Sequence, residues 1–470
     1  MKHADIIQKL NLEQKCALLS GETVFTTRAL PGKGIPAITL SDGPNGVRKQ
    51  AGAADHLGLN PSVPATCFPT SSATACSWDE KLGEAVGEAL GEEAAAQEVA
   101  VLLGPGLNIQ RSPLCGRDFE YFSEDPILAG RMAAAYVRGI QKNGISACPK
   151  HFAVNSQELR RMASDSVLDE RTLRELYLTG FEIVVKEAKP KTIMTSYNLI
   201  NGTYANENAH LLQDILRKDW GFDGAVVTDW GGSNDHALGV KNGSTLEMPC
   251  PGGDSIRELM KAVQDGRISE ADVDARLDEM LELVLSTHAA VEKAPRTFDA
   301  AAHHKLARRA AAESIVLLRN EGGILPLKPN EKLAVIGDFA ETPRYQGAGS
   351  SAVNALQVDT LLDSIKADDS GITFVGYASG FERQGAADAE KLEEAVALAK
   401  KADIVLLCLG LDELRESEGL DRADMKLAEN QQQLLAAVAA VNPNVVVLLS
   451  AGAPVETPWV GQCRALVYGA

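Results

Sequence analysis

Residues 221–232 read GFDGAVVTDWGG and combine a strand pattern with two residues that are unusual at a strand end. Residues 225–228 are apolar or β-branched, as in a buried strand. Asp229 and Trp230 follow where a turn is expected, and two glycines come next. Because Asp after a strand often caps the next helix, this stretch leaves two interpretations of Asp229 open, a helix cap and a site residue.

Strand patterns of this kind alternate with helical patterns through about the first 290 residues. The clearest helix is expected over 169–187, where apolar residues recur at spacings of three and four. Such alternation predicts a (β/α)8-type TIM barrel, which typically takes roughly 250 residues. Seven strands are visible rather than eight, so we expect an irregular barrel. The strands are expected at 37–42, 65–70, 99–109, 145–152, 191–198, 225–229 and 244–249.

A second alternation follows a polar, Ala-rich segment. Parallel strands joined by helices predict a three-layer α/β/α sandwich. We therefore expect a barrel domain over 1–290, a linker over 291–311 and a sandwich domain over 312–470. The last strand has no helix after it, so we expect a fragment or a split protein that lacks a C-terminal segment. The second set of strands is expected at 333–338, 372–377, 403–410, 445–452 and 465–469, with helices at about 388–401 and 429–441.

The composition argues against several classes of protein. The chain has 46 basic and 64 acidic residues, a net charge of −18, which disfavours binding to nucleic acid or to an anionic membrane. No stretch has the pattern of a signal peptide or a membrane span. The eight cysteines are scattered singly and none forms a C-x-x-C pair, which favours reduced thiols over structural zinc. We expect a cytoplasmic protein without a metal or another cofactor.

Polar residues recur at the ends of the expected barrel strands. Asp42, His151, Tyr197, Asp229 and Glu247 each lie at or near such an end. In a (β/α)-barrel these ends meet on one face, where active sites are found. Capping does not easily explain several polar strand ends in succession, so the sequence predicts that Asp229 faces a pocket.

The motifs taken together resemble glycoside hydrolase family 3, the β-glucosidase and β-xylosidase type. The resemblance runs in colinear order from about residue 10 to residue 470. In the barrel it rests on SDGPNGVR (41–48), GRDFEYFSEDP (116–126), CPKHFAVNSQELRR (148–161), MTSYNLING (194–202) and VVTDWGG (226–232). In the second domain it rests on AAAESIVLLRNEGGILPL (310–327), YQGAGSSAVN (345–354) and ESEGLDR (416–422).

This resemblance implies a retaining, exo-acting β-glycosidase, most similar to a β-glucosidase. Asp229 matches the nucleophile, which forms a covalent glycosyl-aspartate, and Glu418 matches the general acid/base. The resemblance also implies a set of substrate-binding residues, among them an aromatic wall at Trp230: Asp42, Arg48, Arg117, Lys150, His151, Met194, Tyr197 and Trp230. The substrate would be a small-molecule or oligosaccharide β-glycoside. The family commonly adds a fibronectin-like domain, and a homo-oligomer is possible.

The chemistry calls for such a pair of carboxyl groups. Cleavage with retention uses a carboxylate and a carboxylic acid roughly 5–5.5 Å apart. We expect Lys150 and Arg117 to keep Asp229 ionised. The acid must stay protonated near neutral pH, which burial or a nearby negative charge favours. Glu416 is the alternative to Glu418 as this acid, or its charge raises the pKa of Glu418.

Several alternatives stay open at this point. β-Xylosidase, arabinosidase or another sugar specificity is possible on the same scaffold, although Asp42 suits the 4- and 6-hydroxyls of glucose. The N-acetylglucosaminidases of the family carry a K-H-F-P-G motif, and KHFAVNSQE stands here instead. A non-catalytic sugar-binding protein is a further alternative, but it would be expected to lack one of the two carboxyl groups. His303 and His304 are expected at the surface of the linker.

Overall fold

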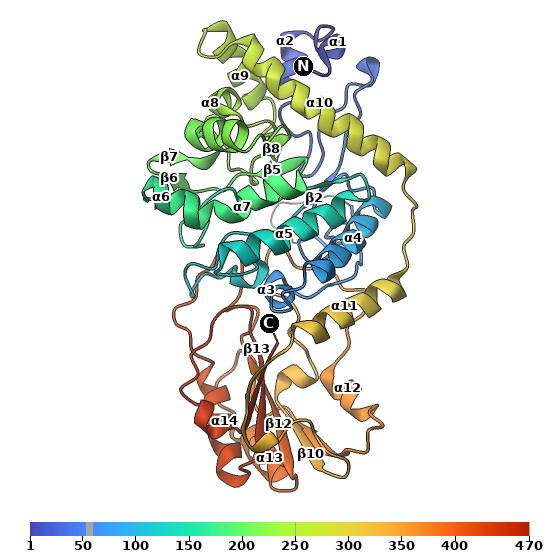
Figure 1. Ribbon diagram of the computed structural model, residues 1–470, viewed down its shortest axis with the longest axis vertical. Coiled ribbons are helices and arrows are strands. Elements are labelled where there is room, and N and C mark those ends of the chain that lie inside the picture. Colours follow the sequence, from blue (N-terminus) through green and yellow to red (C-terminus); the bar gives the residue numbers. More distant parts are fainter. Residues whose placement is uncertain (53–59, 250, 470) are drawn as a thin grey trace.

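The computed structural model describes residues 1–52, 60–249 and 251–469, and it consists of two bodies with separate hydrophobic cores. Figure 1 shows the first body in blue to yellow and the second, with its long strands, in orange to red. Helix α11 (Ala300–Ser314) lies where the two bodies meet (Figure 1). None of the helices in the described residues has the length and apolar character needed to cross a membrane.

Parallel strands form the wall of the first body. β1 (Leu40–Asp42), β2 (Val101–Leu103) and β3 (Ser146–Ala147) make one sheet in this order. β5 (Thr192–Met194) pairs in parallel with β8 (Ala225–Val227). Single parallel bridges extend the wall, from Phe152 to Thr195 and from Val227 to Leu246. The predicted barrel type is confirmed, with strands shorter than the sequence patterns indicated.

Two of the predicted barrel strands differ from the structure. Residues 65–70 form no strand in the described part of the chain, and Ala65 instead makes one bridge to Ala355 of the second body. Pro64 precedes this stretch and Pro69 lies within it, and both lack the N–H group that a strand ladder needs. Residues 244–249 contribute single bridges at Leu246 and Glu247 in place of a full strand.

Helices cover the outside of the barrel wall. The helix predicted over 169–187 is confirmed. It consists of α6 (Glu170–Thr172) and α7 (Thr179–Ile183), each followed by a π-helical segment. Gly87 allows the helices over 80–96 and 126–141 to pack closely. A Cβ at this position would lie only 2.4 Å from the carbonyl oxygen of Tyr136. The other helices of this body are α1 (Ala4–Ile7), α2 (Leu12–Ala17), α3 (Ser71–Ala75), α4 (Glu80–Ala96), α5 (Pro126–Gln141), α8 (His236–Asn242), α9 (Asp254–Gln264) and α10 (Glu270–Lys293).

A small sheet on the rim of the barrel fixes a long loop. β4 (Asp165–Ser166) pairs with β6 (Leu199–Ile200), and β6 pairs with β7 (Thr203–Tyr204). These pairs hold residues 155–164, which precede β4, next to the chain that leaves β5. The loop therefore has a defined position at the end of the barrel where the polar strand ends lie.

The second body is built on one six-stranded sheet of order β11-β10-β12-β13-β14-β9. The five strands that the sequence predicted are present and parallel: β10 (Lys332–Ile336), β11 (Thr373–Ala378), β12 (Ile404–Gly410), β13 (Val445–Ser450) and β14 (Ala465–Gly469). β9 (Val316–Asn320) joins them as an antiparallel edge strand, which the expectation of a purely parallel sheet did not include. An antiparallel edge strand on a parallel sheet is common in such folds.

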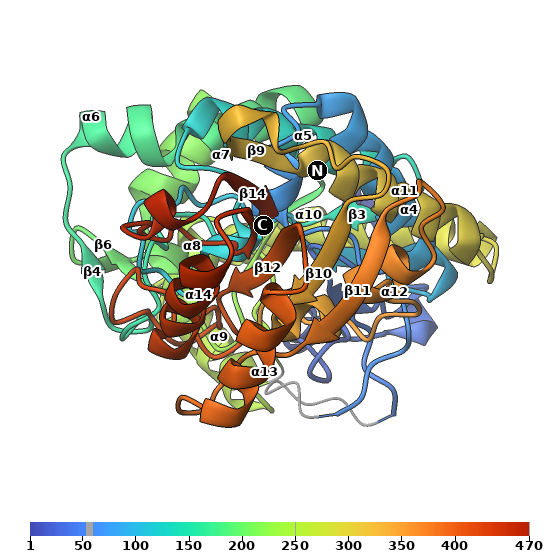
Figure 2. The same cartoon turned by 90° about the horizontal axis from the view of Figure 1, so that it is seen from below.

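Helices lie on both sides of this sheet, as the predicted sandwich requires. Figures 1 and 2 show α13 (Ala389–Ala399) and α14 (Glu429–Val441) on one side, and α11 and α12 (Leu361–Lys366) on the other. The loop between β12 and α14 leaves the carboxyl end of β12, where α/β sheets commonly present functional groups. This loop carries Glu416 and Glu418.

The segment predicted as a linker is largely helical, and one of its histidines is buried. α11 begins at Ala300, so non-helical chain is confined to residues 294–299 of this region. His303 is 6% exposed and contacts Glu93 of α4, with 2.7 Å between Nδ1 and Oε1. The expectation of a surface position is wrong for His303 because the two acidic side chains of α4 bind its ring, Glu92 being the second.

The cysteines in the described residues are all unpaired, as the sequence predicted. Five of the seven are buried, and burial raises the pKa of the Cys148 thiol to about 12. Cys250 lies outside the described residues.

Candidate active site

Asp229 lies at the carboxyl end of β8 and does not cap the next helix. The cap of α8 is Asp235, whose side chain accepts the N–H of Leu238. Asp229 is 8% exposed, and its Oδ1 accepts the N–H of Trp230 at 2.8 Å. Gly231, with φ of 81°, turns the chain there, and its N–H donates to the carbonyl of Met248. The helix-cap interpretation is therefore wrong for Asp229.

His151 lies beside Asp229 with its orientation fixed from three directions. Its Nε2 is 3.5 Å from Asp229 Oδ2, and its Nδ1 is 3.1 Å from the hydroxyl of Tyr121. Asn108 holds its backbone, accepting its N–H at 2.7 Å and donating to its carbonyl at 2.9 Å. Burial, and next Arg117 and Lys150, hold the pKa of His151 well below its usual value. The low pKa favours the neutral ring, in which Nδ1 faces the hydroxyl of Tyr121 and Nε2 faces Asp229.

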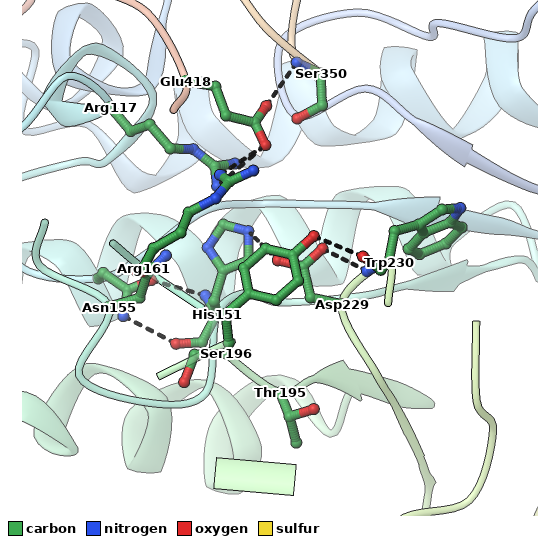
Figure 3. Close-up of polar contacts among 12 residues, drawn as sticks. Arg117, His151, Asn155, Arg161, Thr195, Ser196, Asp229, Trp230, Ser350 and Glu418 are labelled. Carbon is green, nitrogen blue, oxygen red and sulfur yellow. Dashed lines mark hydrogen bonds and ion pairs between the residues drawn. The ribbon is translucent and has the colours of Figure 1, made fainter. Parts of the chain in front are cut away.

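Glu418 reaches the same site from the second body (Figure 3). Its backbone N–H donates to the carbonyl of Ala348 at 3.0 Å, and its Oε2 accepts the N–H of Ser350 at 2.7 Å. Its Oε1 faces the barrel, 2.9 Å from Arg161 Nη1 and 3.7 Å from Arg117 Nη1. Glu418 is thus held by a loop of its own body and directed at two guanidinium groups of the other.

Glu416, the alternative to Glu418, points into the second body. Its side chain is fully buried, forms an ion pair with Arg344 and accepts the N–H of Gly452 at 3.2 Å. The two carboxyl groups therefore have different surroundings. The structure brings Glu418, and not Glu416, beside Arg117 and Arg161.

The charge state of Glu418 differs from the sequence expectation. Burial raises the pKa of Glu418, but Arg117 and Arg161 lower it more strongly, so the pKa lies well below its usual value. The net shift is therefore downward and not upward, because the two guanidinium groups dominate. Glu418 is ionised in the free protein.

Asp229 has the opposite shift. Burial raises its pKa, Arg161, Arg117 and Lys150 act against burial, and Glu418 adds to the increase. The expectation that Lys150 and Arg117 favour the ionised form is confirmed in direction. The net shift nevertheless follows burial.

Asp42, Arg48 and Lys150 form another charged part of this site. Asp42 ends β1, and the N–H of Arg48 donates to its carbonyl at 2.9 Å. Lys150 is 2% exposed and follows β3. Burial raises the pKa of Asp42 to about 6, although Lys150 and Arg48 favour its ionised form. A carboxyl group that interacts with two cations is suited to accept hydrogen bonds from the hydroxyl groups of a neutral ligand.

Tyr197 and Trp230 form an aromatic part of the site. The hydroxyl of Tyr197 donates to the carbonyl of Trp230 at 2.9 Å, and the indole Nε1 donates to the carbonyl of Val24 at 2.7 Å. The indole also contacts Phe25, with 5.3 Å between ring centroids. Met194 ends β5 and is 1% exposed in the barrel core, where its backbone bonds to Phe152 and Pro149.

The sequence motifs contained two site residues to which we had assigned no role, Arg161 and Ser350. Arg161 contacts Glu418 and Glu158 and lies 4.9 Å from the centroid of the Tyr197 ring. The two arginines that end the motif 148–161 could have indicated this site residue. Ser350 contributes its backbone N–H rather than its side chain, so no residue pattern could have revealed it.

The arrangement suits chemistry on a neutral, hydroxyl-rich ligand. Two carboxyl groups from different bodies face one site, and cations, a neutral histidine and an indole surround them (Figure 3). Among the described residues, no group of three His, Cys, Asp or Glu side chains is arranged to hold a metal ion. Retaining cleavage uses an ionised nucleophile and a protonated acid, whereas here the pKa of Asp229 is raised and the pKa of Glu418 is lowered.

Family models match both bodies. The model of the glycosyl hydrolase family 3 N terminal domain matches residues 47–283, and that of the family 3 C-terminal domain matches residues 315–470. The chain belongs to glycosyl hydrolase family 3. The resemblance stated from the motifs is thereby confirmed.

Curated family 3 relatives are similar along almost the whole chain. Thermostable beta-glucosidase B of Acetivibrio thermocellus is 45% identical over 98% of this chain and 61% of the relative. Exo-alpha-(1->6)-L-arabinopyranosidase of Bifidobacterium breve is 44% identical over 98% of this chain and 62% of the relative. The chain therefore spans about three fifths of the length of these relatives.

Solved family 3 structures have the same fold. The GH3 beta-glucosidase of Bifidobacterium adolescentis superposes with a TM-score of 0.91 at 43% identity, covering 98% of this chain and 66% of that one. Beta-glucosidase 3B from Thermotoga neapolitana in complex with glucose gives a TM-score of 0.88 at 33% identity, covering 99% and 71%.

Proposed function

We propose that this chain carries the catalytic centre of a retaining, exo-acting β-glycosidase, most similar to a β-glucosidase. The proposal rests on one observation above all, which is that Asp229 and Glu418 enter the same site from two bodies. The names of the relatives support a glycosidase, and most of those described here are beta-glucosidases.

In the proposed reaction, the Asp229 carboxylate attacks the anomeric carbon of the terminal sugar. The bond from this carbon to the leaving oxygen breaks, and Glu418 in its acid form donates a proton to that oxygen. The resulting glycosyl-aspartate is then hydrolysed by water. Glu418 takes one proton of the water, and the hydroxyl attacks the anomeric carbon and displaces Asp229.

The surrounding groups would bind the sugar and hold these charges. Asp42, Lys150 and Arg117 are placed to bond hydroxyls of the terminal sugar, and Trp230 offers an apolar face. Arg48 and Tyr197 would act as second-line contacts, and Met194 would contribute from beneath the site. Neutral His151 would donate its Nε2 proton to Asp229 or to a sugar hydroxyl, and its contacts with Tyr121 and Asn108 keep that proton in place.

A second specificity has its own support. A relative that is 44% identical over 98% of the chain is named an exo-alpha-(1->6)-L-arabinopyranosidase, which fits the arabinosidase alternative. Arabinopyranose lacks the hydroxymethyl group of a hexopyranose, so groups near Asp42 would decide between the two sugars. We favour glucose because Asp42, between Lys150 and Arg48, suits the 4- and 6-hydroxyls.

A panel of aryl glycosides tests the proposal. We expect turnover of p-nitrophenyl β-glucoside, less turnover of the α-L-arabinopyranoside and β-xyloside, and a β-configured first product by NMR. A protein that releases nitrophenol from none of them would be a sugar-binding protein and would contradict the proposal. Inversion of the anomeric centre would contradict the mechanism.

The biological setting is also a proposal. The scattered single cysteines, typical of reduced thiols, support a cytoplasmic enzyme. The greater length of the relatives supports a further segment or fibronectin-like domain, on this chain or on another. Size measurement of the purified protein would decide whether it is a homo-oligomer.

A further inference from the structure

The loop that carries Glu418 is attached to the barrel by a carboxylate three residues further on. Asp421 Oδ1 accepts the N–H of Glu158 at 2.9 Å and the N–H of Gly116 at 3.2 Å, and its Oδ2 accepts the N–H of Leu159 at 2.9 Å. All three donors belong to barrel loops. Hydrogen bonds from N–H groups to a carboxylate are stronger than those between neutral groups.

A second carboxylate makes the reciprocal contact. Glu158 of the barrel is 2% exposed, and its Oε2 accepts the N–H of Gly419, the residue after Glu418, at 2.7 Å. Each of the two loops therefore supplies a carboxylate that accepts backbone N–H groups of the other. Arg422 extends the junction, because its N–H donates to the carbonyl of Leu114 at 2.8 Å.

Glu418 has a separate attachment to its own body. Its N–H bonds to Ala348 and its Oε2 accepts the N–H of Ser350. These contacts keep Glu418 on the second body but do not determine where that body places it over the barrel. From the barrel, Arg161 and Arg117 contact its carboxylate. The contacts of Asp421 and Glu158 join the backbone on its carboxyl side to barrel loops.

We propose that Asp421 is a positioning residue that sets Glu418 at its working distance from Asp229. The inference rests on the proposed glycosidase function. Asp421 touches neither carboxyl group and acts through the backbone of the barrel loops. Loss of its contacts would leave both bodies folded and Glu418 bound to Ser350, but the acid/base would no longer be held at one place over the sugar.

The test compares Asp421→Ala with Asp424→Ala in the intact chain. Asp424 is an exposed residue of the same loop whose carboxylate accepts the N–H of Lys426, a neighbour in sequence. A displacement of about 1 Å in a catalytic group can cost on the order of 100-fold in rate. We expect such a loss in kcat for a glucoside with a poor leaving group, and little change in KM.

Substrate dependence separates positioning from general destabilisation. A dinitrophenyl glucoside needs no proton for its departure, so Asp421→Ala should slow formation of the glycosyl-enzyme from it far less. Added azide should restore part of the steady-state rate. Asp424→Ala should behave as the unchanged chain. Equal losses with both substrates, or no loss at all, would overturn the proposal.

A second measurement does not depend on activity. Hydrogen exchange of the segments 116–118, 158–161 and 416–422 should accelerate in Asp421→Ala and stay unchanged in Asp424→Ala. If Asp421→Ala fails to fold, Asp421→Asn keeps one acceptor oxygen and should give a smaller change in the same direction. Unchanged exchange would contradict the inference. If the protein without substitutions cleaves no glycoside, only the proposed function is contradicted. The hydrogen-exchange result then decides whether Asp421 positions the loop.

Discussion

Arg161 Nη1 lies 2.9 Å from Glu418 Oε1, so a barrel side chain neutralises the charge of the carboxylate that the second body supplies. The guanidinium also lies 4.9 Å from the centroid of the Tyr197 ring. It forms a second ion pair with Glu158. A proton donor in ionised form cannot begin the proposed reaction. We infer that the active protonation state, with Glu418 protonated and Asp229 ionised, is a minor state of the free protein.

The pH profile of Arg161→Gln should show this coupling. Arg161 lowers the pKa of Glu418, so removing its charge raises that pKa and keeps the acid protonated to higher pH. Arg161 also lowers the pKa of Asp229, so both pKa values of the pair should rise, and both limbs of the kcat/KM profile should move to higher pH for a substrate with a poor leaving group. Arg161→Lys keeps the charge and serves as the control. A limb at the same pH in both variants would contradict the assignment.

Asp229→Asn should abolish turnover without harm to the fold. Burial raises the pKa of Asp229, and a carboxyl group with a raised folded pKa favours folding in its protonated form. The loss of stability therefore begins as the pH rises above the unfolded pKa and is complete above the folded pKa, and an amide removes that cost. We expect a loss of several orders of magnitude in kcat and a Tm at pH 7 equal to or above that of the unchanged chain.

A mechanism-based 2-fluoroglycoside provides the complementary measurement. It should trap the glycosyl-enzyme on Asp229, and mass spectrometry of the labelled peptide should identify this residue. A label on any other carboxyl group would show that the nucleophile has been assigned wrongly, even if Asp229→Asn is inactive.

Glu418→Ala and Glu416→Ala should fail in different ways. Without its acid/base, Glu418→Ala should lose activity most on poor leaving groups, less on dinitrophenyl glycosides, and regain part of it with azide. Glu416→Ala should lose stability instead, because it leaves Arg344 buried and unpaired. Breaking a buried ion pair typically costs about 3–5 kcal/mol, which denaturant unfolding would detect. Azide rescue of Glu416→Ala alone would reverse the two roles.

The sequence predicted this site better than it predicted the strands around it. Asp229, His151 and Tyr197 could be located because polar residues at the ends of apolar runs form a pattern with one physical meaning in a barrel. The stretch 65–70 has the same apolar character, but Pro64 before it and Pro69 within it disfavour a ladder there. The β9 strand was missed because an edge strand of five residues after a helix has no periodicity to detect.

The electrostatics of the site could not be predicted from residue types. The pKa of Glu418 depends on which face of its loop meets Arg117 and Arg161, and that is set by docking between two bodies rather than by local sequence. His303 shows the same limit. Its polar, Ala-rich neighbourhood indicated a surface linker, whereas its partner Glu93 comes from a helix two hundred residues earlier.

His303 should make the stability of the protein depend on pH. Burial lowers the pKa of His303, but the hydrogen bond to Glu93 and the charges of Glu93 and Glu92 outweigh it, so the net shift is upward. A raised folded pKa contributes stability that is fully present below the unfolded value of about 6.5 and is lost as the pH rises through the folded pKa.

His303→Gln removes this contribution. Hydrogen bonds to charged groups contribute about 1.5–3 kcal/mol, so we expect a deficit of this order at pH 6 that becomes smaller by pH 9. Denaturant unfolding of both proteins at the two pH values measures the difference, with His304→Gln, whose ring contacts the partly exposed Asp359, as the control. A deficit that is the same at both pH values would show that His303 does not titrate with folding.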